Sequence, residues 1–172
     1  MDFFYPNFIN DHWRIEGQLF FNDRNYFVLP DRKAFDRKAV VAFSQLKGIA
    51  FYDTATAVRR LRNNASDEFL EVVEPTDIRS LLCGLPQCKA IVTTGKKATE
   101  TVCASLGIAE VPGVNASVPV PEHFLAGLTP APGAQRRQLL LYRLPSSSRA
   151  YPLSFDKKVA AYRAMFETVG IL

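Results

Sequence analysis

The sequence predicts a three-layer α/β/α fold, in which helices cover both faces of a central, mainly parallel sheet. Short apolar runs alternate along the chain with segments of helical periodicity. Strands that are apolar throughout are typical of a parallel sheet buried on both faces. The length of 172 residues suits one domain with a sizeable core. We therefore expect residues 1–172 to form a single domain.

Two helices and a strand are predicted in the first third of the chain. Apolar residues at helical spacing mark a helix over 8–20, weakened by Gly17, and a second helix over 36–46. Gly48 directly follows the second helix, at the position where glycine commonly ends one. The apolar run 49–52 then predicts a short buried strand.

The middle of the chain alternates between strand and helix. Residues 55–76 have mixed polarity, so we expect a long connection, followed by a short helix that begins at Thr76. The apolar run 90–93 predicts a second buried strand. Gly95 then turns the chain into a helix, and its inner stripe carries Ala98, Val102, Cys103 and Leu106.

A loop, a strand and a helix are predicted in the last third. Residues 111–133 are rich in proline and poor in periodicity, which indicates a loop or insertion. The run 139–142 predicts a third strand. Apolar residues three or four positions apart mark the last helix over 154–169, and Ser154 can cap its start.

The composition favours a cytoplasmic protein with a polyanionic partner. The net charge of +4 favours such a partner through counterion release, although each basic cluster taken alone is more simply a solvated face. No apolar run approaches the roughly 20 residues that cross a bilayer. The N-terminus lacks the basic and apolar parts of a signal peptide. We therefore expect a cytoplasmic location and no membrane partner.

The three cysteines do not form a metal site by their spacing. Cys83, Cys88 and Cys103 have no second pair and no nearby histidine, whereas zinc needs about four ligands in a recognisable pattern. We expect all three to be small buried side chains. The two histidines, His12 and His123, have no obvious partners, and the chain is expected to use no metal or other cofactor.

The ends of the predicted strands mark where a ligand is expected. In an open parallel sheet, ligands bind at the carboxyl ends of the strands. The strands are followed by Asp53-Thr54, by 93–97 and by 144–149. Asp53 either hydrogen-bonds within a pocket or caps its turn. Lys96 and Lys97 open a helix, where backbone N–H groups favour an anion.

Three segments, in this order along the chain, carry a family resemblance. The first is Phe3-Phe4-Tyr5-Pro6-Asn7-Phe8-Ile9-Asn10-Asp11-His12-Trp13-Arg14, in which an aromatic pair and a turn precede Asn-x-x-Trp-Arg. The second is Ile91-Val92-Thr93-Thr94-Gly95-Lys96-Lys97-Ala98. The third is Leu144-Pro145-Ser146-Ser147-Ser148-Arg149-Ala150-Tyr151, followed by an amphipathic helix. Together they resemble the uracil-DNA glycosylase superfamily, and most closely its DNA-deoxyinosine (hypoxanthine) and mismatch-specific uracil branch. Residues 48–53 and 65–67 resemble two further elements, with Ser66 and Asp67 ordering a loop beneath the site.

The resemblance implies a monofunctional DNA glycosylase that acts as a monomer on double- or single-stranded DNA. Such an enzyme flips out uracil or hypoxanthine and hydrolyses its N-glycosidic bond without a cofactor. Asn10 falls at the position of the catalytic amide that orients water, and an ordinary helix cap is the alternative. The resemblance implies a base pocket of Phe3, Phe4, Tyr5, Trp13, Asp53 and Thr94. It implies DNA contacts by Lys96, Lys97, Ser146, Ser147, Ser148, Arg149 and Tyr151.

Two departures from the family pattern leave alternatives open. The family begins with a strand ending in a Gly-x-Phe-Pro type motif before the aromatic segment, so we expect either further residues upstream of Met1 or a shortened, inactive form. Leu144 stands where many uracil glycosylases carry histidine, which is consistent with the deoxyinosine branch. The alternatives are a catalytically inactive DNA-binding module of the same fold and a small α/β protein-interaction unit.

Overall fold

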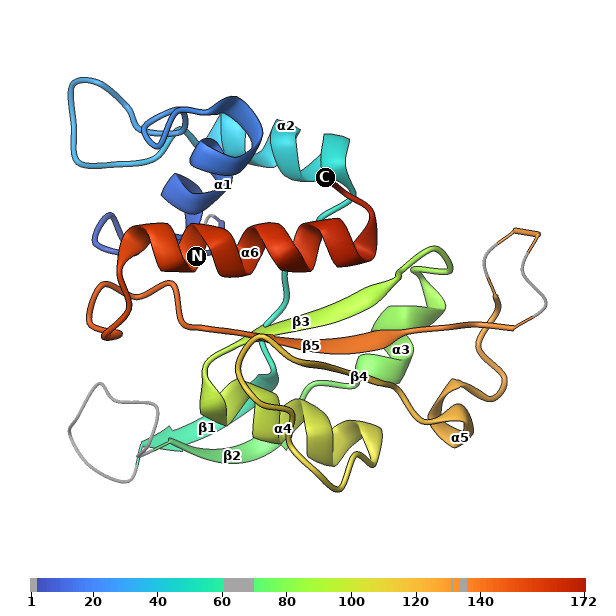
Figure 1. The fold of residues 1–172 in the computed structure, drawn as a ribbon. Helices are drawn as coiled ribbons and strands as arrows, with labels where there is room; N and C mark the ends of the chain where they lie inside the picture. The colour runs from blue at the N-terminus through green and yellow to red at the C-terminus, as the bar shows by residue number, and fades with distance from the viewer. Residues whose placement is uncertain (1–2, 61–69, 131, 134–135) are drawn as a thin grey trace. The chain divides into compact units, whose positions relative to one another are not determined.

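The computed structural model describes residues 3–60, 70–130, 132–133 and 136–172. The chain divides into two compact units, which we describe separately. Residues 1–52 and 145–172 form the first unit, and residues 53–144 form the second (Figure 1). The predicted mixed α/β class is confirmed. Ser66 and Asp67 lie outside the described residues.

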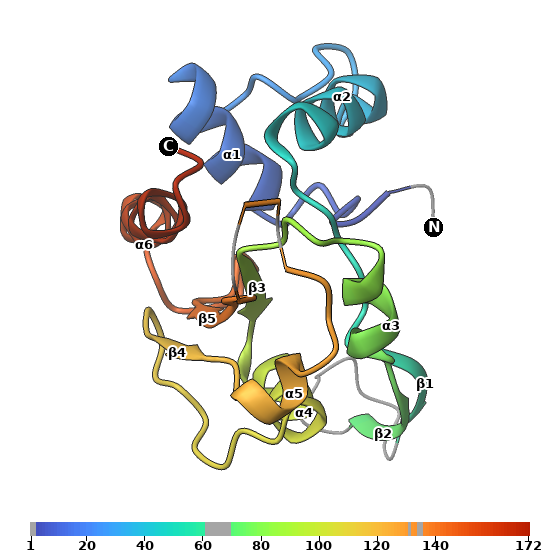
Figure 2. The ribbon, with the colours of Figure 1, turned by 90° about the vertical axis from the view of Figure 1, so that its right-hand side faces the viewer.

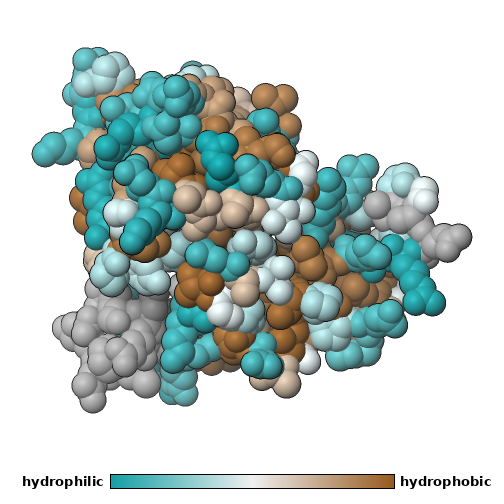
Figure 3. Space-filling view, viewed as in Figure 1, coloured by the Kyte–Doolittle hydropathy of each residue, from teal (hydrophilic) through white to brown (hydrophobic). Residues whose placement is uncertain are grey.

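The first unit is built from three helices. These are α1 (His12–Phe21), α2 (Arg37–Lys47) and α6 (Phe155–Val169), and α1 packs against α6 (Figures 1 and 2). The surface of the molecule in the view of Figure 1 mixes hydrophilic and hydrophobic residues (Figure 3). The exposed residues of α6 include Lys157, Ala160, Arg163, Ala164 and Glu167. In the part of the chain that the structure describes, no helix has the length and apolar character needed to cross a membrane.

The predicted ends of α2 and α6 are confirmed, but the predicted start of α1 is wrong. Asp36 caps α2 by accepting from two backbone N–H groups, and Gly48 ends it with a φ of 66°. Ser154 caps α6 through the backbone N–H of Lys157. The first helix begins at His12 rather than Phe8, because Asn10 is bound through its backbone N–H to Asn7 and forms a β-bridge with Ser148.

Aromatic side chains form the core of the first unit. Trp13, Phe27, Phe35, Val40 and Phe43 are buried together. Gly17 lies on the crowded side of α1, where an added Cβ would stand 2.5 Å from the carbonyl oxygen of Asp23. This glycine therefore reflects the close approach of the following turn to the helix.

The second unit contains a three-stranded mixed sheet. Its strand order is β3 (Ala90–Thr94), β5 (Leu140–Leu144) and β4 (Ser117–Pro119), with β3 parallel and β4 antiparallel to β5. A separate antiparallel pair joins β1 (Ala55–Arg60) to β2 (Leu70–Pro75). The helices of this unit, seen with the sheet in Figure 2, are α3 (Ile78–Cys83), α4 (Lys96–Leu106) and α5 (Glu122–Leu125).

Three sequence predictions for these segments are wrong. The run 49–52 forms no strand, and its side chains are exposed or half-buried. The expected connection over 55–76 contains β1 and β2 instead, and the expected loop over 111–133 contains β4 and α5. The β1–β2 pair is exposed along much of its length, so charged residues interrupt the apolar run that would have marked a buried strand.

The core of the second unit lies beneath α4. Val102, Cys103 and Leu106 are buried there, as the helical stripe predicts, and they pack with Leu82, Val120, Leu128, Leu139 and Leu141. The prediction for the cysteines is right for Cys103 and wrong for Cys83, which is exposed at the end of α3. Arg137 is also buried rather than solvated, because its guanidinium donates to three backbone carbonyl groups, those of Leu82, Leu85 and Thr129.

Candidate functional site

The start of α1 and the loop 145–149 meet in the first unit, and we call this place the α1–loop site. Asn10 forms an antiparallel bridge with Ser148. The backbone N–H of Asp11 donates to the carbonyl oxygen of Ser147 over 2.9 Å. The two segments lie far apart in the sequence: Asp11 and Arg149, for example, are separated by 138 positions. The fold therefore joins two of the three segments that carry the family resemblance.

A buried carboxylate fastens the loop to the helix. Asp11 Oδ1 accepts from Arg149 Nε over 2.8 Å, and Asp11 Oδ2 accepts from Lys158 Nζ over 3.3 Å. Lys158 also donates to the carbonyl oxygen of Ser148 over 2.7 Å. The side chain of Lys158 is only 1% exposed, and a charge buried to this degree requires its partners. The loop conformation thus depends on Asp11 and Lys158.

Positive charge is in excess around this carboxylate. The guanidinium of Arg14 lies 4.2 Å from the ring centroid of Phe8 and donates to that residue's carbonyl oxygen. Burial lowers the pKa of Arg14, the charge of Arg149 lowers it further, Asp11 opposes the shift and Arg24 adds to it. One carboxylate, that of Asp11, therefore faces the charges of Arg14, Arg149 and Lys158, while Arg24 acts on Arg14.

The amide of Asn10 takes part in the helix start. Its Oδ1 accepts from the backbone N–H of His12 over 2.9 Å, a bond between residues two apart that closes an Asx-type turn just before the helix. The N-cap residue itself is Asp11, whose side chain makes no capping bond, so Asn10 is not the helix cap. An amide oxygen has a second lone pair, and the NH2 group of the side chain carries two donors. The turn therefore leaves Asn10 with acceptor and donor capacity for a water molecule or a ligand.

The predicted pocket aromatics divide into core and half-buried residues. Trp13 is 1% exposed, and its indole N–H donates to the carbonyl oxygen of Phe4, so it is part of the packed core. Phe3, Phe4 and Tyr5 are half-buried. The ring of Phe4 stacks on Phe51 at 5.8 Å, and the ring of Tyr5 stacks on His12 at 4.1 Å.

The serines of the loop support its local turn. Ser146 Oγ accepts from the backbone N–H of Ser148, and Ser148 Oγ accepts from that of Ala150. Ser147 is buried and is hydrogen-bonded to Tyr162. Tyr151 is half-buried, and its backbone N–H closes the turn on Ser148. Ser146 and Ser148 each accept one bond and still have a proton to donate, so both are compatible with phosphate contacts. The predicted DNA contact by Ser147 is wrong in this structure, because its side chain is buried.

A buried acid–base pair lies on α1 and was not predicted. His12 and Glu16 are almost fully buried, one helical turn apart, with 3.7 Å between His12 Nε2 and Glu16 Oε1. Burial lowers the pKa of His12 to about 3 and raises the pKa of Glu16 to about 8. At neutral pH both side chains are therefore uncharged. Their i, i+4 spacing was a signal in the sequence, since it places both on one helix face.

Lys158 was also missed, and its signal was weaker. It lies beside the apolar stripe of α6, between Phe155 and Tyr162, where a lysine interrupts an otherwise apolar face. A charged residue at such a position indicates a buried ion pair only when its partner is known. That partner, Asp11, lies 147 positions away, so local sequence did not identify it.

No protein-family model, no curated protein and no solved structure matches this chain. Its function is therefore argued from the residues of the α1–loop site. Within the described ranges, no group of three or more His, Cys, Asp and Glu side chains is arranged to hold a metal ion.

The other predicted site residues belong to the second unit. Thr94 ends β3 and is half-buried. Lys96 opens α4 after Gly95, and its exposed ammonium lies 3.7 Å from Glu100. The carbonyl oxygen of Asp53 accepts from the hydroxyl of Thr76, and its side chain is exposed.

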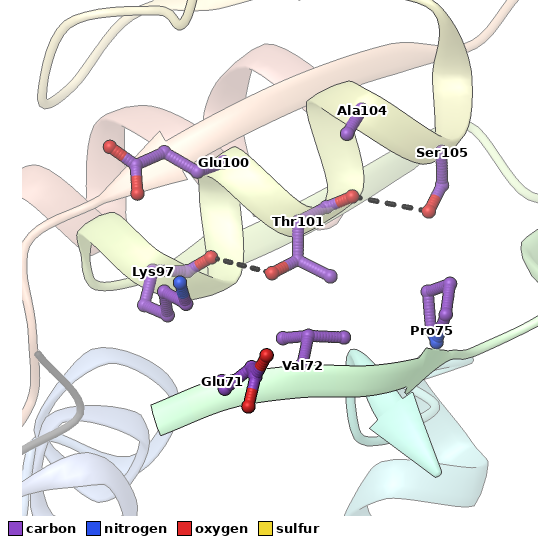
Figure 4. A pocket seen from close by; sticks show the side chains of 8 residues that line it. All are labelled: Glu71, Val72, Pro75, Lys97, Glu100, Thr101, Ala104 and Ser105. Atoms are coloured by element: carbon purple, nitrogen blue, oxygen red, sulfur yellow. Dashed lines mark hydrogen bonds between the residues drawn. The ribbon is translucent and has the colours of Figure 1, made fainter. Parts of the chain in front are cut away.

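Lys97 lines a groove between β2 and α4 (Figure 4). The groove has a volume of about 560 Å³. Two carboxylates share its walls with Lys97, and the hydroxyls of Thr101 and Ser105 donate back into α4. The lining residues are Glu71, Val72, Pro75, Lys97, Glu100, Thr101, Ala104 and Ser105. The carboxylates reduce the positive potential that a phosphate contact by Lys97 would use.

Proposed function

We propose that this chain is a monofunctional DNA glycosylase that removes uracil or hypoxanthine from DNA. The finer fold assignment, a three-layer α/β/α arrangement around a mainly parallel sheet, is part of the same proposal. So are action as a monomer, on double- or single-stranded DNA, and a cytoplasmic location. The observation that supports it most is the pairing of Asn10 with Ser148, because the resemblance requires Asn10, the turn at Gly95 and the loop 145–149 to act at one site, and this pairing joins two of the three.

The charge of the α1–loop site supports a nucleic-acid partner. Arg149 bonds Asp11 and is accessible to solvent, with 44% of its side chain exposed. Arg14 and Lys158 lie behind it and are buried. DNA phosphates bind where lysine and arginine are in excess over carboxylates. The loop that carries Arg149 is also held rigidly by Asp11 and Lys158, so the cation is presented in a fixed position.

The proposed reaction is a hydrolysis at C1′ of the damaged nucleotide. Asn10 orients a water molecule whose oxygen bonds to C1′ as the C1′–N bond breaks. The bonding electrons leave with the base, and the proton released by the water ends on the base, so the products are an abasic sugar and a free base. An amide does not deprotonate water at neutral pH, so stabilisation of the charge on the sugar and the base provides most of the rate enhancement.

Base release from defined oligonucleotides tests this proposal. Purified protein is incubated with duplexes and single strands that carry uracil, hypoxanthine or xanthine, and alkali-cleavable sites are counted. We expect release of uracil or hypoxanthine, and a loss of about 100-fold or more in Asn10→Ala, as when one oriented polar group is removed from an active site. Asn25→Ala is the matched control, since Asn25 is an exposed loop residue of the same unit.

A second variant separates catalysis from folding. Asn10→Ser keeps an oxygen that can accept from the His12 N–H, but it removes the amide. We expect its thermal stability to stay close to that of the unmodified protein while base release is lost. Full activity in Asn10→Ala would remove Asn10 from the proposed role.

The second candidate function is a DNA-binding module without catalysis. The observation that favours it is the bond from the His12 N–H to Asn10 Oδ1, because a role in this local turn alone would account for the asparagine. This candidate predicts DNA affinity that falls with salt concentration and no alkali-cleavable product from any of the oligonucleotides. Any abasic product that Asn10→Ala fails to make would exclude it.

A further inference from the structure

Tyr5 is held in an unusual conformation above a buried histidine. Its φ of 54° lies in the left-handed region, which bulky residues rarely adopt, and the proline that follows it favours extended backbone instead. The ring of Tyr5 stacks on the imidazole of His12, with 4.1 Å between centroids and 18° between planes. This stack helps to hold a strained residue in place.

His12 provides a flat surface inside an aromatic surround. Trp13, Phe51 and Tyr162 all meet the imidazole edge-on, at centroid distances of 4.8, 5.4 and 6.1 Å. Tyr5, by contrast, covers it face to face. A flat ring in the place of Tyr5 would therefore have a stacking surface below it and the ring of Phe51 beside it, 6.0 Å from the present Tyr5 ring between centroids.

Packing alone does not account for a histidine at this position. Among the described residues, neither His12 nitrogen has a hydrogen-bond partner, and Glu16 Oε2 also lacks one. The distance of 3.7 Å between the two side chains is longer than a hydrogen bond. Buried polar atoms without partners destabilise a fold. Hydrogen bonding therefore does not explain why a histidine stands here, and the contact that it does make is the one between its ring face and Tyr5.

The loop reaches the same aromatic cluster through Tyr162. The ring of Tyr162 lies 6.1 Å from the imidazole of His12, measured between centroids. Its hydroxyl lies 3.5 Å from the carbonyl oxygen of Pro145, and it is hydrogen-bonded to Ser147. Hydroxyl and carbonyl groups therefore adjoin the rings around His12.

We propose that Tyr5 occupies the place of the extruded nucleobase, and that the base displaces Tyr5 and stacks on His12. The ligand class is a neutral, planar heterocycle with donors and acceptors on its edge, such as uracil or hypoxanthine. His12 is then a binding residue, and Tyr5 is a competitor for the base rather than its stacking platform. This inference rests on the proposed function, since it names the residues that would hold its substrate base.

Equilibrium dialysis with radiolabelled free uracil and free hypoxanthine tests this without any DNA. Tyr5→Gly removes the competing ring, and glycine adopts a φ near 54° without strain. We expect Tyr5→Gly to bind at least one base about 2- to 12-fold more tightly, which is the range of one aromatic pair. Adding His12→Leu to Tyr5→Gly should reverse this gain. Tyr26→Gly is the matched control, because it removes a tyrosine stacked on Phe21 elsewhere in the same unit.

The outcomes separate this inference from the proposed function. Equal or weaker binding by Tyr5→Gly, or no binding of either base by any variant, overturns the displacement of Tyr5. If abasic product is nevertheless formed, the glycosylase proposal survives that result. If Tyr5→Gly tightens base binding while no oligonucleotide is cleaved, the base site stands and the glycosylase role fails. Thermal melting of each variant shows that it is folded.

Discussion

The pair formed by His12 and Glu16 makes the stability of this protein depend on pH in a defined way. The pKa of His12 falls from 6.5 to about 3 on folding, and that of Glu16 rises from 4.5 to about 8. Between pH 3 and 6.5 the unfolded chain binds the histidine proton and the folded chain does not, so stability rises with pH. Between pH 4.5 and 8 the folded chain keeps the Glu16 proton and the unfolded chain loses it, so stability falls with pH.

The two effects cancel between pH 4.5 and 6.5 and act alone outside that window. Each limb should have a slope of about 1.4 kcal/mol per pH unit. We expect Glu16→Gln to abolish the fall in unfolding free energy from pH 6.5 to 8 and His12→Phe to abolish the fall from pH 4.5 to 3. Urea unfolding across pH 3 to 9 measures both. If the unfolding free energy of Glu16→Gln still falls from pH 6.5 to 8, the fall is due to another titrating group.

Breaking the buried ion pair at the loop should destabilise the protein far more than breaking an exposed pair. Removing Asp11 leaves the ammonium of Lys158 buried without its carboxylate, so we expect Asp11→Ala to cost about 3–5 kcal/mol. The control is Glu100→Ala, which removes the exposed partner of Lys96 and should cost less than about 1 kcal/mol. Lys158→Met in the Asp11→Ala background should recover much of the loss, and urea unfolding gives all three values.

At the scale of the element, residues with local consequences were predictable from the sequence. The ends of α2 and α6 follow from Asp36, Gly48 and Ser154, whose side chains or φ angles act on their own helix ends. The strand predicted over 49–52 was wrong because four apolar residues in a row fit a strand pattern whether or not a neighbouring strand pairs with them. The β1–β2 pair was missed for the opposite reason: its exposed strands carry charged residues, although their backbones are paired.

The turn that follows α1 requires glycine at position 17, because it passes close to that residue. An Ala at position 17 would ordinarily favour a helix by about 1 kcal/mol over Gly. Here its Cβ would stand 2.5 Å from the carbonyl oxygen of Asp23, a backbone atom with little freedom to move. We therefore expect Gly17→Ala to lower the melting temperature despite its better helix propensity. The control is Gly113→Ala, because a Cβ added at position 113 has no atom within 4 Å. We expect this variant to leave the melting temperature nearly unchanged, and differential scanning calorimetry compares the two variants.

At the scale of the whole molecule, the sequence indicated which segments of the chain belong to the α1–loop site, but it did not indicate which side chains bond to one another there. Asn10 and the loop 146–149 were singled out separately, and the structure joins them. The partners that hold them together, Asp11 and Lys158, could not be paired from the sequence, because a long-range ion pair leaves no local pattern. Lys97 shows the converse, since carboxylates from β2 and α4 line the same groove as a lysine that the sequence indicated as an anion contact.

The net charge of +4 does not by itself determine which surface would bind DNA. The salt dependence of DNA affinity in two charge variants tests whether the α1–loop site is that surface. The logarithm of the DNA association constant falls with the logarithm of salt concentration, with a slope of about 0.9 per phosphate neutralised. If the α1–loop site is the contact, Arg149→Gln should lower the slope by about one unit. Arg136→Gln removes an equal charge from an exposed position beside Glu122 in the second unit and should leave the slope unchanged.

Both variants change the net charge equally, so a general electrostatic attraction would lower both slopes alike. That result would exclude the α1–loop site as the specific contact. Fluorescence anisotropy with a labelled duplex from 50 to about 200 mM salt covers the range in which this difference is measurable.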